Sequence, residues 1–227
     1  MSRASKTPGL PLEDSRSELQ RELETLRGEL ERMSEELARR TLERTQLQQT
    51  IHELTELSLR DPLTALFNRR GLSERLVEEW SRARRYGAPL SLMMVDIDHF
   101  KRINDQHGHA VGDVAIGHVA RLLARDRRLS DILARYGGEE FVLLLPHTPR
   151  DGALSLAERL RYLIERSPYR TAGGEAQLTV SIGVAGFDAA MREAGELLEL
   201  ADSALYRSKR EGRNRVSLAE PERPEDL

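Results

Sequence analysis

The residues best suited to chemistry form one short run, GGEEF at positions 137–141. Two glycines favour a tight turn, because both can adopt positive φ, and the flanking runs 132–136 and 141–145 are apolar enough to form the strands of a hairpin. The turn would expose backbone beside two carboxylates, which suits a phosphate and a metal ion held together. The simpler alternative is a structural hairpin with a charged tip.

A second group of acids follows an apolar run at 90–97. Asp96 and Asp98 occupy alternate positions, so a strand would direct both to one face. A carboxylate at the end of a buried strand suits Mg²⁺, which prefers carboxylate and phosphate oxygens. Lys101 follows, where it could meet phosphate charge. The alternatives are a solvated strand end with Asp98 capping a turn, and an ordinary surface lysine.

The next polar segment is NDQHGHAVGD at 104–113, in which two glycines mark a turn into a helix. An amide from Asn104 and a carboxylate from Asp113 could recognise a guanine edge, since aspartate accepts from the N1 and N2 protons. Helix capping is the alternative for both residues. His107 and His109 do not complete a zinc site, because the chain has no cysteine and no further spaced pair of ligands.

Upstream of these segments, apolar residues recur in steps of four and three. They are Leu19, Leu23, Leu26, Leu30, Met33 and Leu37, and then Leu47, Ile51 and Leu54. Arg40 and Arg44 occupy the seam positions in between and weaken its middle. A heptad seam of this length predicts a parallel dimeric coiled coil, about 60 Å long over residues 19–57. Asp61-Pro62 is expected to end the helix, because proline disfavours helical backbone in the residue before it.

The rest of the chain alternates between helical and strand patterns. Helices are predicted over 68–86, 111–124, 151–166 and 194–210, and strands over 90–97, 132–136, 141–145 and 177–185. The order predicts an α+β fold, a split βαβ sheet flanked by helices and preceded by the long N-terminal coiled-coil helix. Residues 1–16 are expected to be disordered, and residues 218–227 to form a loose acidic tail.

Composition excludes several classes of protein. The net charge of −3 in 227 residues gives no basic surface for nucleic acid. The absence of cysteine excludes disulfides and thiolate chemistry and fits a cytoplasmic location. No apolar run approaches the roughly 18 residues of a membrane span, and the N-terminus lacks the apolar core of a signal peptide.

Five segments together resemble the GGDEF family of diguanylate cyclases in their order and spacing, and the resemblance covers nearly all of residues 60–217. They are DPLTALFNRRG (61–71), DIDHFKRIND (96–105), GHAVGD (108–113), RYGGEEF (135–141) and ALYRSKREGRNRV (204–216). Glu139 stands where many members have aspartate, which keeps the carboxylate. The resemblance implies a sheet of the nucleotide-cyclase or palm type.

The resemblance also implies a reaction between two facing domains, each with one GTP bound. The 3′-hydroxyl of each GTP attacks the α-phosphate of the other, so that two pyrophosphates leave and cyclic di-GMP forms. By matching positions, Asp96, the Ile97 carbonyl and Glu139 hold Mg²⁺, with Mn²⁺ as the alternative metal. Glu139 is also a candidate proton acceptor.

Further residues of the nucleotide site follow from the same resemblance. Backbone N–H groups around Phe100 and Lys101 cradle the phosphates, and the Lys101 side chain stabilises transition-state charge. Asn104 and Asp113 recognise guanine, with His109 near the nucleotide. Gly137 and Gly138 leave space for the nucleotide. Lys209 and Arg213 match the family's ligands for the terminal phosphate.

A second site is implied by the run RLSD at 128–131, which resembles the inhibitory RxxD site that binds product. Arg128 would fork onto guanine O6 and N7, and Asp131 would accept from the other edge of the base. Arg159 matches the family's secondary contact to product bound by a neighbouring domain. The alternative for an Arg-x-x-Asp pair is a surface salt bridge.

The sequence thus predicts a product-inhibited diguanylate cyclase at 61–217, dimerised by a stalk at 17–60. GTP is the expected substrate, and cyclic di-GMP the expected product and inhibitor. A homodimer is expected, with higher oligomers that product cross-links through Arg128 and Arg159. The alternative is a catalytically silent receptor for cyclic di-GMP, or a scaffold.

Overall fold

The computed structural model describes residues 12–171 and 174–219. The chain divides into two compact units, Met1–Leu57 and Ser58–Leu227. Residues 1–16 are predicted to be disordered. Residues 1–11 of this segment lie outside the described residues, and residues 12–16 form the start of a helix. No helix within the described ranges has both the length and the apolar composition needed to cross a membrane.

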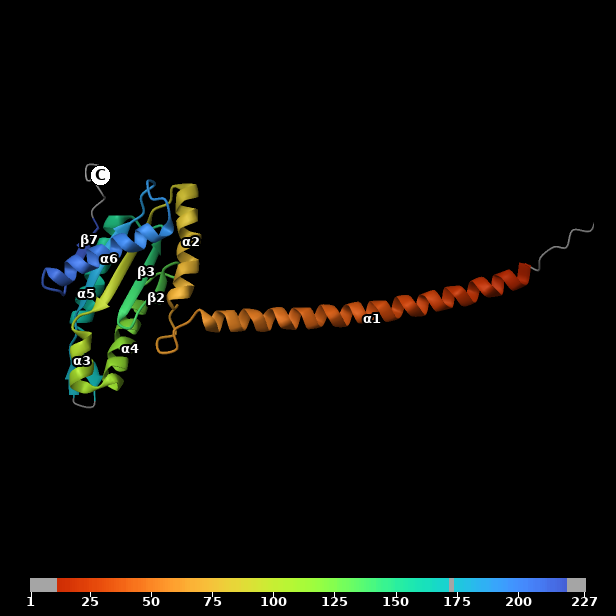
Figure 1. Ribbon diagram of the computed structural model, residues 1–227, viewed down its shortest axis with the longest axis horizontal. Helices are drawn as coiled ribbons and strands as arrows, with labels where there is room; N and C mark the ends of the chain where they lie inside the picture. Colours follow the sequence, from red (N-terminus) through yellow and green to blue (C-terminus); the bar gives the residue numbers. More distant parts are fainter. Residues whose placement is uncertain (1–11, 172–173, 220–227) are drawn as a thin grey trace, which may run out of the picture. The chain divides into compact units, whose positions relative to one another are not determined.

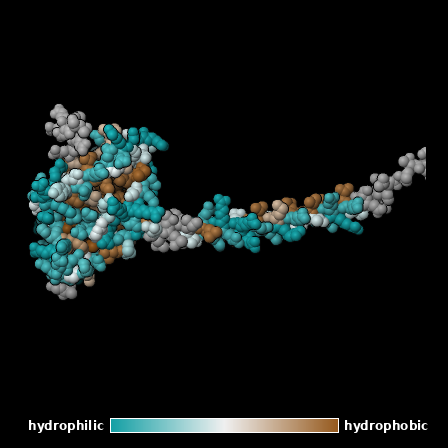
Figure 2. Space-filling model, viewed as in Figure 1, coloured by the Kyte–Doolittle hydropathy of each residue, from teal (hydrophilic) through white to brown (hydrophobic). Residues whose placement is uncertain are grey.

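Helix α1, Leu12–Ser58, contains 47 residues, which corresponds to about 70 Å, and it confirms the predicted long N-terminal helix (Figure 1). The apolar seam side chains from Leu19 to Leu47 are exposed, from 51% for Leu23 to 68% for Leu30, and Figure 2 shows hydrophobic residues along one side of the helix. Arg40 instead pairs with Glu36, with Nη2 2.6 Å from Oε1. An exposed apolar stripe on an otherwise charged helix is typical of a helix that packs against a partner.

The second unit is built around a five-stranded sheet with the order β2-β3-β1-β6-β7. The strands are β1 (Leu90–Ile97), β2 (Ile132–Arg135), β3 (Glu140–Pro146), β6 (Val180–Gly186) and β7 (Val216–Leu218). Central β1 pairs antiparallel with β3 and β6, and β7 runs parallel to β6. All residues of β1 are buried, which explains why apolar residues dominate both faces of this strand. The arrangement confirms the predicted α+β class.

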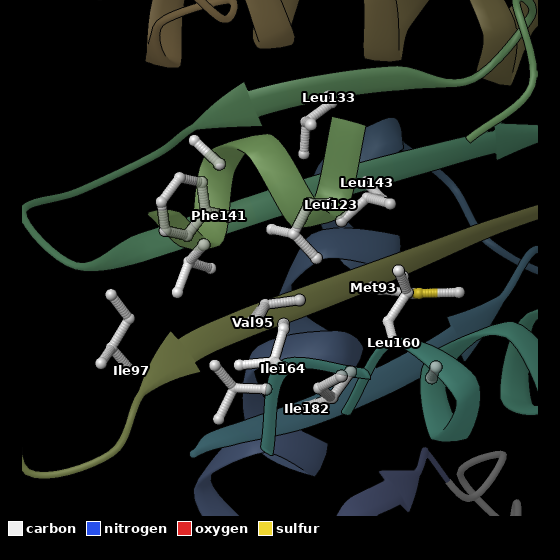
Figure 3. Packing of buried hydrophobic residues seen from close by; sticks show 14 of the residues in the cluster. Met93, Val95, Ile97, Leu123, Leu133, Phe141, Leu143, Leu160, Ile164 and Ile182 are labelled. Carbon is white, nitrogen blue, oxygen red and sulfur yellow. The ribbon is translucent and has the colours of Figure 1, made fainter. Parts of the chain in front are cut away.

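Helices cover both faces of this sheet (Figure 1). They are α2 (Arg69–Tyr86), α3 (Phe100–His107), α4 (His109–Arg125), α5 (Arg150–Glu165) and α6 (Ala194–Arg210). Figure 3 shows one buried cluster, with Met93 and Val95 of β1 among Leu123 of α4 and Leu160 of α5. A second cluster contains Leu92 and packs β1 against α2 and α6. Alternate residues of β1 therefore belong to two cores, which fix the end of this strand in place.

The structure contains three short features that the sequence does not predict. They are α3, the hairpin of β4 (Tyr169–Thr171) with β5 (Gly174–Ala176), and the edge strand β7. The chain beyond β7 still contacts the sheet, because the Ala219 N–H donates to the Val184 carbonyl at 2.6 Å. The loose tail expected from residue 218 therefore remains paired with the sheet at residue 219, and from residue 220 it lies outside the described residues.

Candidate active site

The end of β1 lies beside the GGEEF run because β1 and β3 are antiparallel neighbours. Asp96 is opposite Glu140 in the register of the two strands. The Ile97 N–H donates to the Glu139 carbonyl at 3.3 Å. The structure therefore brings the backbone of Glu139 to the strand end that carries Asp96 and Ile97. These are the three residues that the resemblance groups around a metal ion.

The connection between β2 and β3, residues 136–139, is called the signature turn below. It closes a hairpin as predicted, with the N–H groups of Tyr136 and Gly137 both donating to the Glu140 carbonyl, at 2.8 and 3.3 Å. The expected positive φ is wrong, since neither Gly137 nor Gly138 has it. Gly137 packs against the Glu140 side chain: an added Cβ would lie 2.3 Å from Oε2 of Glu140, so this flexible carboxylate would have to move. An added Cβ on Gly138 would meet nothing within 4 Å, so the outer surface of the turn is open.

Asp96 is only 6% exposed, and its Oδ2 lies 2.8 Å from Nζ of Lys209. Burial raises the pKa of Asp96 from 3.8 to about 6, against the opposing effect of Lys209, and the charges of Glu139 and Glu140 add to the rise. Three carboxylates therefore repel one another at this point. A divalent cation would relieve that repulsion and favour the ionised form of Asp96.

Asp96 should make the stability of the fold depend on pH. Its pKa is about 6 in the fold and near 3.8 as a free side chain, so the folded chain binds more protons between these values. The free energy of unfolding therefore falls as pH rises through this window, by up to about 3 kcal/mol. Asp96→Asn should abolish this pH-dependent decrease. The test is urea unfolding in a metal chelator between about pH 4 and pH 8, followed by the fluorescence of Trp80, the single tryptophan. Parallel stability curves for the two proteins would contradict the prediction.

Asp98 belongs to the fold rather than to this group of acids. It is 5% exposed, and its carboxylate accepts from the hydroxyls of Thr179 and Ser181, both at 2.7 Å, and from the Asn214 N–H at 3.0 Å. The solvated strand end considered from the sequence is therefore wrong. Asp98 ties the end of β1 to the segment entering β6 and to the loop that follows α6.

The predicted guanine-binding residues lie at the corner between α3 and α4. Asn104 packs so closely on Gly112 that an added Cβ there would lie 2.0 Å from Oδ1 of Asn104. That oxygen is buried and has no hydrogen-bond partner among the described residues, which costs about 1–3 kcal/mol. Asp113 follows Gly112 directly, and His109 and Asp113 are exposed one turn apart on α4. The structure thus brings the three predicted side chains to one corner.

The cationic side chains predicted to meet phosphate differ in their surroundings. Lys101 is exposed in the first turn of α3, next to buried Phe100. His99 precedes that helix with left-handed backbone and supplies no side-chain cap, and such a helix start favours anions. Lys209 pairs with the Asp96 carboxylate in this structure. Arg213 is exposed and left-handed, with φ 63°, and neither it nor Lys101 forms an ion pair within the described residues.

The predicted inhibitory residues form a closed turn after α4. The Asp131 carboxylate is 3% exposed, and its Oδ2 accepts from the backbone N–H of Arg128 at 2.7 Å. It closes this turn rather than forming the surface salt bridge considered from the sequence, and residue Arg128 is exposed. Arg159 of α5 pairs with Asp126 at 2.8 Å, so it is held beside the segment that leads into the turn.

Two residues that the sequence analysis does not select also contact the signature turn region. Arg135 and Asp61 form an ion pair of 3.0 Å, with side chains only 16% and 15% exposed. Arg135 directly precedes the turn, and Asp61 opens the DPLT run. Both residues lie in segments that resemble the GGDEF family, at 61–71 and 135–141, which could have marked them as candidates. No local spacing in the sequence predicts that they pair with each other.

Comparison with known proteins decides the family. A model of the diguanylate cyclase GGDEF domain matches residues 58–215. The chain belongs to the GGDEF-domain diguanylate cyclase family. The diguanylate cyclase DgcP of Pseudomonas aeruginosa is 46% identical over 170 residues, which are 74% of this chain and 25% of that protein. The response regulator PleD of Caulobacter vibrioides is 40% identical over 172 residues, 75% of this chain and 38% of that protein. This family member therefore spans well under half the length of these relatives.

Solved structures of the family share the fold, and one of them also contains a coiled coil. The coiled coil and GGDEF domain of DgcB from Caulobacter crescentus, in complex with c-di-GMP, has a TM-score of 0.75 at 32% identity, covering 82% of this chain and 99% of that one. SiaD of Pseudomonas aeruginosa, with its activator SiaC, has a TM-score of 0.72 at 35% identity and covers 91% and 80%. An active GGEEF domain from Vibrio cholerae has a TM-score of 0.65 at 33% identity and covers 68% and 98%.

Proposed function

We propose that this chain is a diguanylate cyclase that condenses two GTP molecules into cyclic di-GMP. In each of two steps the 3′-oxygen of one GTP forms a bond to the α-phosphorus of the other, the bond to pyrophosphate breaks, and the hydroxyl proton is released. The observation that carries the proposal is the meeting of Asp96, Ile97 and Glu139 where β1 ends beside the signature turn. The active GGEEF domain from Vibrio cholerae supports a glutamate at position 139.

The donor set at this point fits Mg²⁺, or Mn²⁺ in its place. Two carboxylates and the Ile97 carbonyl are hard oxygen ligands, and Mg²⁺ typically takes one or two carboxylates together with substrate phosphates. When bound, it neutralises phosphate charge and activates the attacking hydroxyl. No group of three or more His, Cys, Asp or Glu side chains that could hold a metal occurs within the described residues. A backbone carbonyl and the nucleotide phosphates would therefore complete this site.

The remaining residues of the site would bind and orient GTP. The uncapped start of α3 at Phe100 and the Lys101 side chain would hold the phosphates and stabilise the charge that develops in the transition state. Guanine at the α3–α4 corner would donate N–H groups to Asn104 and Asp113, and the buried Oδ1 of Asn104 needs such a donor. The other proposed contacts are His109 near the nucleotide, the open surface at Gly137 and Gly138, and Lys209 and Arg213 at the terminal phosphate.

The reaction requires two domains, and we assign their pairing to α1. Its apolar seam side chains from Leu19 to Leu47 are more than half exposed, and a parallel dimeric coiled coil would bury them. The neighbouring DgcB structure likewise combines a coiled coil with a GGDEF domain. GTP is a nucleotide of the cytoplasm, so the proposal keeps the expected cytoplasmic location.

Product inhibition is the second part of the proposal. Arg128 is exposed beside Asp131 on a closed turn, and Arg159 is held nearby through Asp126. Arginine recognises guanine with a forked pair of hydrogen bonds. A neighbouring structure, that of DgcB, is a complex with c-di-GMP. Product bound through Arg128 and Arg159 of adjacent domains would also support higher oligomers.

A nucleotide assay tests the function directly. Purified chain is incubated with GTP and Mg²⁺, and the nucleotides are separated. The proposal expects one cyclic di-GMP and two pyrophosphates for every two GTP consumed. Binding of added cyclic di-GMP without any turnover would favour the receptor or scaffold alternative instead.

Arg128→Ala should relieve product inhibition while leaving the initial rate close to that of the wild type. Loss of a forked contact worth about 1–3 kcal/mol should raise the inhibitory concentration of cyclic di-GMP about tenfold or more. Initial rates are measured with increasing amounts of added product. Arg125→Ala is the matched control, because Arg125 is an exposed arginine at the end of α4, and it should keep wild-type inhibition. Equal inhibition of the two variants would contradict the assignment.

A further inference from the structure

The Arg135 side chain connects two distant parts of the second unit. Its Nε and Nη2 donate to the Gly138 carbonyl at 3.1 and 2.8 Å. Its Nη1 donates to Oδ1 and Oδ2 of Asp61 at 3.2 and 3.0 Å. One guanidinium, 16% exposed, therefore uses all three of its nitrogens on these two partners. We refer to Asp61, Arg135 and the Gly138 carbonyl as the brace.

The brace acts on the peptide group directly before Glu139. The next carbonyl, that of Glu139 itself, accepts from the Ile97 N–H at 3.3 Å. The carbonyl before Glu139, that of Gly138, is therefore held by Arg135, and the carbonyl of Glu139 itself is held by Ile97 at the end of β1. Two glycines precede it, and glycine restrains the backbone least of all residues. Without the brace, the Gly138 carbonyl would lose its two hydrogen bonds from Arg135, and the peptide group before Glu139 would be held less firmly.

Asp61 is itself a rigid anchor. Its Oδ1 accepts from the N–H and the hydroxyl of Thr64, at 2.9 and 2.7 Å. Its backbone N–H donates to the Leu66 carbonyl, and its carbonyl accepts from the Ala65 N–H, both at 2.8 Å. A second link runs beside the brace, since the Arg135 N–H donates to the Phe67 carbonyl at 2.8 Å. Hydrogen bonds other than those to Arg135 therefore also hold the turn after α1.

We infer that Arg135 and Asp61 are positioning residues that set the Glu139 carboxylate for the metal ion. The inference rests on the proposed function, because it takes Glu139 as a metal ligand. A ligand must be held to within about half an ångström for full effect, and partners of metal ligands typically contribute about 10–100-fold to affinity or activity. Asp61 lies three residues after the last residue of α1, so the brace also links the segment leaving the stalk to the signature turn.

The test uses Arg135→Lys and Asp61→Asn in the full chain, alone and combined. Lysine keeps the charge but lacks the planar fork that serves both partners, and asparagine keeps the shape and the Oδ1 acceptor. Arg82→Lys is the matched control, because Arg82 pairs with Glu79 at 2.8 Å on α2. Binding of Mn²⁺ alone is measured by electron paramagnetic resonance without nucleotide. The Mg²⁺ dependence of the rate and the KM for GTP at saturating Mg²⁺ are measured separately.

Each single variant should weaken Mn²⁺ binding about tenfold and shift the Mg²⁺ dependence by a similar factor, with KM for GTP changed less than about twofold. The double variant should bind Mn²⁺ no more weakly than the single variant with the lower affinity, because both changes break the same Asp61–Arg135 connection. Arg82→Lys should bind Mn²⁺ like the wild type. Melting temperatures are recorded for all of them, and a loss of Mn²⁺ affinity in a variant that melts like Arg82→Lys identifies positioning rather than unfolding.

Wild-type Mn²⁺ affinity in Arg135→Lys and Asp61→Asn would overturn the brace, even where the wild-type chain makes cyclic di-GMP. Additive losses in the double variant would overturn the single connection between the two residues. A wild-type chain that binds Mn²⁺ but makes no product would refute the proposed function and leave the brace supported by the binding losses. A wild-type chain with no Mn²⁺ binding would refute the brace as well.

Discussion

Glu139→Gln should lower the rate of cyclic di-GMP formation by on the order of 100-fold or more. The change keeps the size of the side chain but removes the negative charge at the point where the signature turn meets Asp96 and Ile97. A neutral amide is a poor ligand for Mg²⁺, and charge stabilisation by the metal is a large part of phosphoryl-transfer catalysis. Initial rates at saturating GTP and Mg²⁺ measure the effect.

Glu139→Asp is the matched control for this prediction. It keeps the carboxylate and places at position 139 the residue that many family members carry, so the rate should stay within about tenfold of the wild type. Glu139 is partly exposed, and a surface substitution should leave the melting temperature of both variants nearly unchanged. If the amide and the shorter acid were equally active, Glu139 would not be a metal ligand.

The second large effect is expected from the stalk. Leu30→Glu combined with Leu37→Glu places charge at two seam positions whose side chains are 68% and 63% exposed in the single chain. Each buried leucine in a core is worth about 2–5 kcal/mol, so four new glutamates should dissociate a coiled-coil dimer. At protein concentrations where the wild type is dimeric, the rate should fall at least about tenfold and should rise with the square of protein concentration.

Leu42→Glu provides the control on the same helix. Leu42 is 61% exposed, as exposed as the seam residues, but it lies two positions after Arg40 and therefore about 200° around the helix from the seam. This variant should keep the mass of a dimer by sedimentation velocity and the rate of the wild type. If the double seam variant remained a dimer and stayed active, the proposed role of α1 would be wrong.

Much of the scaffold follows from local sequence. The strand at 90–97 and the helix at 194–210 are predicted to the residue, because one is a long apolar run and the other a long amphipathic pattern. The eight residues of α3 carry no comparable signal, since the helix starts after the left-handed residue His99 without a side-chain cap. Strand β7 contains only three residues and forms through parallel pairing with β6, so its local sequence hardly predicts it.

The sequence by itself determined the long helix with its apolar seam, the class of the fold and the runs of acids, amides and glycines that suit a metal and a nucleotide. Residue types and short spacings carry that information directly. Only the tertiary structure decided that Asp98 is consumed by the fold, that Lys209 reaches Asp96 and that Arg135 joins Asp61 to the signature turn. These choices depend on strand register and on contacts between residues far apart in the chain, which no local spacing encodes.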